Sequence, residues 1–128
     1  MLVETPTGPQ GFPAITPRIV SSKPTEPAMT AQDVIDYVLA HPVTGTGRIQ
    51  TAGPITVERV EFLPARAVHA RLNAASGRSD EAPLCLVTVH GSFTLHGMRG
   101  MTPLRGTIVF QVYDAKTGHF LLQGVDAR

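Results

Sequence analysis

Apolar residues recur with a helical period near residue 30 and with strand-like alternation in the second half of the chain. The helical period covers residues 31–41, and the apolar face is formed by Val34, Ile35, Val38 and Leu39. Thr30 is a favourable N-cap, and Asp33 stands at the third helical position, as in a capping box. Because Pro42 cannot continue a helix, we expect this helix to end after His41.

Four later segments have the alternation and β-prone composition of strands, and they cover residues 55–63, 84–95, 104–113 and 119–125. In segment 84–95 one face is apolar and consists of Cys85, Val87, Val89, Phe93 and Leu95. The alternation of apolar residues changes phase between Val57 and Val60, which predicts a bulge. Between the first two strands, residues 64–75 favour a second helix that Gly77 would end.

The last two strands flank the sequence Asp-Ala-Lys-Thr-Gly at residues 114–118. This spacing predicts an antiparallel hairpin in which Asp114 opens the turn and Gly118 takes the left-handed conformation, with Thr117 before it. The order of elements predicts an α+β fold, in which one or two helices pack on a four-stranded antiparallel meander sheet. Residues 29–128 would form this single domain.

Six of the eleven prolines fall within the first 27 residues, which favours an extended proline-rich tail or linker over residues 1–28. The tail has more apolar character than a spacer needs, because it contains Phe12, Ile15, Ile19 and Val20. Two interpretations stay open. The tail is a simple tether, or its apolar residues add to the sheet edge of a neighbouring subunit.

Charge and composition narrow the range of partners. Eleven basic and ten acidic side chains nearly cancel, and the chain has no tryptophan, so neither a phosphate backbone nor stacked bases would be attracted. We therefore expect no nucleic-acid partner. No apolar run is long enough to span a bilayer, and a membrane would be reached only through an N-terminal anchor removed from a precursor.

The residues that could carry chemistry do not form a recognisable catalytic or metal-binding pattern, so we expect no cofactor and no enzyme. Cys85 is the single cysteine and has apolar neighbours, which favours a buried position. His90 and His96 share a strand face but lie roughly 20 Å apart, too far for one metal ion unless the strand bends and His119 joins them. A Cys85–His90–Asp114 set lacks a nucleophile elbow.

The hairpin carries a family resemblance. Residues 112–121, with Asp114, Thr117 and Gly118 as a D-x-x-T-G turn, resemble the C-terminal hairpin of PepSY-like and cystatin-like domains of secreted bacterial proteins. Residues 30–39 are similar to the opening helix of those domains, and residues 86–91 to a central strand. The resemblance covers residues 29–124. It implies an extracytoplasmic, secreted or cell-surface module with an inhibitory, regulatory or assembly role.

Three functions follow as hypotheses. The first is a non-enzymatic interaction module tethered by residues 1–28 and bound to a protein partner. The second is a self-assembling filament or surface-layer subunit, whose tail residues 12–20 add to a neighbour's sheet edge. The third is a small cone-shaped fold that binds a ligand or acts as a hydrolase, which the wholly aliphatic and aromatic inward faces disfavour.

Overall fold

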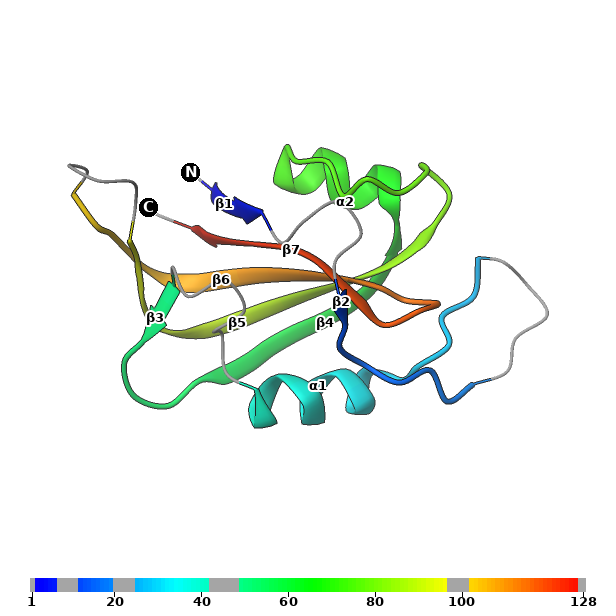
Figure 1. Ribbon diagram of the computed structural model, residues 1–128, viewed down its shortest axis with the longest axis horizontal. Coiled ribbons are helices and arrows are strands. Elements are labelled where there is room, and N and C mark those ends of the chain that lie inside the picture. Colours follow the sequence, from blue (N-terminus) through cyan, green and yellow to red (C-terminus); the bar gives the residue numbers. More distant parts are fainter. Residues whose placement is uncertain (1, 7–11, 20–24, 42–48, 97–101, 127–128) are drawn as a thin grey trace.

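The computed structural model describes residues 2–6, 12–19, 25–41, 49–96 and 102–126, and they form two helices and one antiparallel sheet (Figure 1). The elements in chain order are β1 (Leu2–Pro6), β2 (Phe12–Pro13), α1 (Ala31–Ala40), β3 (Ile49–Thr51), β4 (Thr56–Pro64), α2 (Ala65–Leu72), β5 (Pro83–Leu95), β6 (Leu104–Asp114) and β7 (His119–Asp126). The predicted α+β fold, with two helices on an antiparallel meander, is confirmed.

The meander consists of β4, β5, β6 and β7, each paired antiparallel with the next. These are the four strands predicted from the sequence. The structure adds three short strands: β1 and β2 both pair with β7, and β3 pairs with β5 beyond the end of β4. The sequence predicts no strand for β3, because its three residues are too few to show an alternation.

Helix α1 begins as the sequence predicts. The Thr30 hydroxyl accepts from the Asp33 amide, and the Asp33 carboxylate accepts from the Thr30 amide, which completes the capping box. Val34 and Val38 are fully buried, but Leu39 is 49% exposed, so its expected place on the apolar face is wrong. The residues of α1 that pack in the core are Val34 and Val38, with Tyr37 partly buried against them, and Leu39 is not among them.

Helix α2 is shorter than predicted. Pro64 is its N-cap, and the helix ends at Leu72 because Asn73 takes the left-handed conformation, with φ of 52°. Asparagine adopts this conformation more readily than most residues. Gly77, the expected end of the helix, has φ of 80° in the loop that follows.

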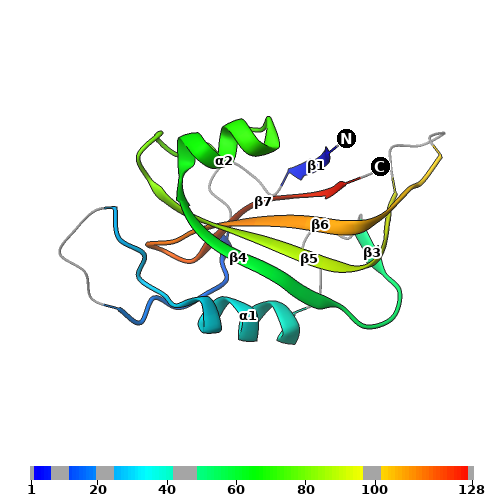
Figure 2. The same cartoon turned by 180° about the vertical axis from the view of Figure 1, so that it is seen from behind.

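Hydrophobic residues are buried on both faces of the sheet, with α1 over one face and α2 over the other (Figure 2). The predicted apolar face of β5 is confirmed, because all five of its residues are buried in the α1-side core. Leu84 and Leu86 point to the opposite face and pack beneath α2. The expectation of wholly aliphatic and aromatic interior faces is wrong, because Gln111 and Gln123 are buried opposite each other.

Two irregularities shape the end of the sheet away from the hairpin. The predicted bulge in β4 lies between Val57 and Arg59, where the pairing with β5 shifts. A second register shift lies in β5 between His90 and Phe93. The edge formed by β3 and β4 is interrupted at residues 52–55, beside that shift, although the Ala52 amide still donates to the Ser92 carbonyl.

Candidate functional site

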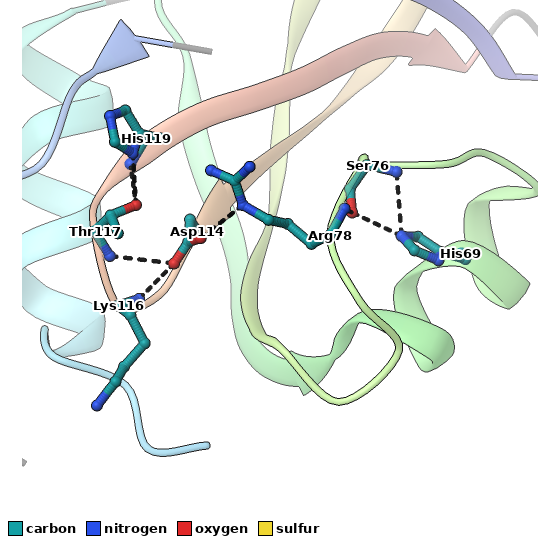
Figure 3. Close-up of polar contacts among 7 residues, drawn as sticks. All are labelled: His69, Ser76, Arg78, Asp114, Lys116, Thr117 and His119. Atoms are coloured by element: carbon teal, nitrogen blue, oxygen red, sulfur yellow. Dashed lines mark hydrogen bonds and ion pairs between the residues drawn. The ribbon is translucent and has the colours of Figure 1, made fainter. Parts of the chain in front are cut away.

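The β6–β7 hairpin is held by hydrogen bonds to the carboxylate that opens it. Asp114 Oδ1 accepts from the amides of Lys116 and Thr117 at 2.8 and 3.1 Å, and the Gly118 amide donates to the Asp114 carbonyl (Figure 3). Gly118 has φ of 77°, in the left-handed region. Asp114 therefore supplies the turn with acceptors that the short loop backbone lacks.

The same carboxylate ties the hairpin to the loop after α2. Arg78 Nε donates to Asp114 Oδ2 at 2.8 Å, and both side chains are largely shielded from solvent, at 23% and 10% exposure. A charge-assisted contact in such a setting is stronger than a surface ion pair. Asp114 thus connects two segments that are 36 residues apart in the chain.

Gly118 also makes close contact with the N-terminal segment. The amides of Ala14 and Ile15 donate to the Gly118 carbonyl at 3.0 and 3.1 Å. A Cβ atom at Gly118 would lie 1.6 Å from the Ile15 carbonyl oxygen, so only glycine allows the two backbones to approach this closely. The Ile15 side chain is 6% exposed and packs in the α1-side core.

Backbone pairing attaches further parts of this segment to the same strand. β1 pairs with residues Leu122 to Asp126 of β7, and β2 pairs with His119 and Phe120. The Ala28 amide donates to the Ala115 carbonyl in the hairpin at 2.7 Å. The edge of β7 and the tip of the hairpin together hold parts of the stretch that the sequence predicts to be a separate tail.

The four tail residues predicted to contact a partner differ in their burial and in their place in the fold. Ile15 is buried within its own chain, whereas Ile19 is 44% exposed. Phe12 is in β2, where its backbone faces Phe120. Val20 lies outside the described residues. Whether residues 1–28 fold apart from residues 29–128 stays a prediction, and so does an extended tail over their whole length.

The histidines considered as metal ligands do not converge. His90 is paired with Ile108, which in turn is paired with Asp126. His119 lies seven residues before Asp126 on β7, which is roughly 23 Å along the strand. His119 Nδ1 lies 2.7 Å from the Thr117 hydroxyl (Figure 3). Within the described part of the chain, no three His, Cys, Asp or Glu side chains are grouped as metal ligands would be.

A histidine–serine pair that sequence reasoning missed lies beside the hairpin. His69 Nε2 is 2.7 Å from the Ser76 hydroxyl and also accepts from the Ser76 amide at 3.1 Å (Figure 3). The Ser76 hydroxyl in turn accepts from the Arg78 amide. The pair closes the loop after α2 and orients Arg78 toward Asp114. His69 and Ser76 are seven residues apart, and Asn73 between them is in the left-handed conformation. Hydrophobic periodicity does not predict that these two side chains meet.

Cys85, the single cysteine, is fully buried, as the sequence predicts. Desolvation raises the pKa of its thiol to about 12. Because the thiolate is the nucleophilic form, the side chain is unreactive at neutral pH and acts as a small apolar residue.

Comparison with protein-family models, with curated proteins and with solved structures found no match to this chain. The resemblance to PepSY-like and cystatin-like domains therefore stays a prediction. No helix within the described ranges is long and apolar enough to cross a membrane.

Proposed function

We propose that the protein is a non-enzymatic, extracytoplasmic interaction module that binds extended protein segments along the outer edge of β7. One observation carries this proposal: that edge pairs with two separate stretches of chain, β1 and β2, through antiparallel backbone ladders. Backbone pairing of this kind is how sheet edges recognise extended peptides.

The opposite edge of the sheet is less suited to such binding. β4 carries a bulge at Glu58 and the charged residues Arg59 and Glu61, and it ends in Pro64. Bulges, charged side chains and proline are the features that keep edge strands from pairing with other chains. This contrast favours β7 as the binding edge, with β1 as the segment that a partner strand would displace.

The resemblance to PepSY-like and cystatin-like domains supports an inhibitory or regulatory role for this module and a location outside the cytoplasm. In this proposal a protein partner supplies an extended strand that replaces Leu2–Pro6. The hairpin contacts at Gly118 would keep the rest of the N-terminal segment in place during the exchange.

A deletion of residues 1–6 tests this proposal. The shortened protein keeps Ile15 and its contacts, and we expect it to bind a synthetic peptide of residues 1–6 supplied in trans, with amide shifts along Leu122–Asp126 in NMR spectra. A peptide of scrambled order and the full-length protein are the matched controls. Absence of shifts in the shortened protein, or equal shifts with the scrambled peptide, would argue against the β7 edge as a binding surface.

Self-assembly is the second candidate function, and the same pairing favours it. The ladder between β1 and β7 depends on backbone groups, so the N-terminal segment of one copy can form it with β7 of another. We expect light scattering behind size-exclusion chromatography to show a species of higher mass as the concentration of the full-length protein rises. Deletion of residues 1–6 should abolish that species. A monomer at every concentration would exclude assembly.

A further inference from the structure

A pocket of about 550 Å³ lies at the end of the sheet away from the hairpin, where β5 shifts its register. Its volume is within the range of small-molecule sites, which is about 300–1,000 Å³. The pocket is lined by Ala52, Ser92, Phe93, Thr94, Arg105, Gly106, Thr107, Ile108 and Asp126. These residues come from the start of β6, the bulged part of β5, the end of β7 and the interruption between β3 and β4.

The backbone creates this hollow. At Gly106 a Cβ atom would lie 2.5 Å from the Asp126 carbonyl oxygen, so the end of β7 can form a wall of the pocket only because residue 106 is glycine. Gly91, beside the pocket, is less crowded, because a Cβ there would lie 3.0 Å from the Phe93 ring and 3.2 Å from the Ile55 side chain. The wall at Gly106 is therefore formed by closely packed backbone, whereas side chains surround Gly91.

The polar groups in the lining are suited to an anion. Arg105 is exposed, and its guanidinium has no hydrogen bond or ion pair within the described part of the chain, unlike Arg71 and Arg78. Ser92, Thr94 and Thr107 add three hydroxyl groups. Asp126 has interactions of its own and adds a negative charge at the wall.

We propose that this pocket binds a small organic carboxylate. The planar guanidinium of Arg105 would donate two parallel hydrogen bonds to the carboxylate, and the hydroxyl groups would also donate to its oxygens. The hydrocarbon part of the ligand would lie against Ile108, which is half-buried, because the Phe93 ring is buried in the α1-side core. A singly charged carboxylate fits better than a phosphate, because Arg105 is the only cationic side chain among the described lining residues and Asp126 lies in the same pocket.

This inference goes beyond the proposed function, because the pocket would take a small molecule and, apart from Asp126, is lined by residues outside β7. The carboxylate could belong to a free organic acid or to the C-terminus of a peptide. Both present the same group to Arg105, and titration with one probe of each kind separates them.

The test uses the full-length protein and NMR titration with two pairs of probes. The first pair is 4-phenylbutyrate and its uncharged amide, and the second is the tripeptide Ala-Ala-Phe with a free or an amidated C-terminus. We expect the carboxylate of at least one pair to shift the amides of Ser92, Thr94 and Gly106, and to bind at least about tenfold more tightly than its amide. The pair that binds more tightly identifies the source of the carboxylate.

Two variants of equal charge change provide the control. Arg105→Gln should weaken carboxylate binding by at least about tenfold, whereas Arg59→Gln, which alters an exposed arginine on β4, should leave it unchanged. Thr107→Val, which keeps the side-chain shape, should weaken binding by a smaller factor. Binding that is equal for acid and amide, binding reduced alike by both arginine variants, or no shift up to about 10 mM of either acid would overturn the proposal.

Discussion

Replacing Gly118 by alanine would place a methyl group where the N-terminal segment crosses the hairpin. The new Cβ would lie 1.6 Å from the Ile15 carbonyl oxygen, which is part of the backbone and cannot rotate away. The residue would also have to keep a φ of 77°. Gly53→Ala is a matched control, because Gly53 has φ of 80° but nothing within 4 Å of a Cβ atom. The difference between the two variants isolates the contact with the segment.

The expected loss of stability follows from these contacts. A left-handed conformation costs an alanine about 1–2 kcal/mol, and this cost applies at both positions. At Gly118 the collision would also break the two hydrogen bonds from Ala14 and Ile15, at about 0.5–1.5 kcal/mol each, and expose Ile15, at about 1.5–3 kcal/mol. Release of the segment returns some conformational entropy. We therefore expect a loss of about 3–5 kcal/mol for Gly118→Ala and about 1–2 kcal/mol for Gly53→Ala.

Urea denaturation followed by circular dichroism measures both values. Ile15→Ala, combined with Gly118→Ala in a double-mutant cycle, adds a second readout, because the two losses should be strongly non-additive if they report one contact. Equal destabilisation by the two glycine substitutions, or additive losses in the cycle, would refute the contact between Ile15 and Gly118.

Three further predictions concern buried or paired groups. Asp114→Ala leaves Arg78 without its carboxylate and the turn amides without an acceptor, and we expect a loss of about 3 kcal/mol in the free energy of unfolding, against a much smaller loss for a substitution at an exposed acid. Cys85 should not react with a thiol reagent at pH 8 until the protein unfolds, because burial raises its pKa to about 12, and rapid modification of the native protein would contradict this. The hydrogen bond from Arg71 lowers the pKa of Glu61, so the ionised carboxylate contributes stability above its unfolded pKa, and that contribution is lost as the pH falls through the lowered value. Urea midpoints between about pH 6 and 3 should therefore fall less steeply in Arg71→Gln than in the unaltered protein, and parallel curves would count against the pairing.

Local chemistry is enough to predict much of this fold. The capping box at Thr30 and Asp33, the bulge in β4, the alternation in β5 and the turn at Asp114 each depend on residues close together in the chain. Their signals are therefore complete within a short window of sequence. The end of α2 lies three residues before the predicted end at residue 75, because Asn73 takes the left-handed position ahead of Gly77.

The contacts that form the candidate site are beyond such reasoning. The ion pair of Arg78 with Asp114 spans 36 residues, and the contact of Ile15 with Gly118 joins segments from opposite ends of the chain. The pocket around Arg105 draws on four segments that no periodicity connects. Each of these features depends on the register of the sheet, which sets the residues that lie opposite one another.

The sequence alone determined which segments become the main helices, strands and turns in this protein, because backbone preferences and the alternation of apolar residues are local properties. The pairing of the N-terminal segment with β7, and the contact that Gly118 makes with this segment, emerge only when distant parts of the chain come together. The physical reason is that backbone hydrogen bonds along a sheet edge carry little side-chain signature, so the choice of partner depends on the geometry of the whole sheet.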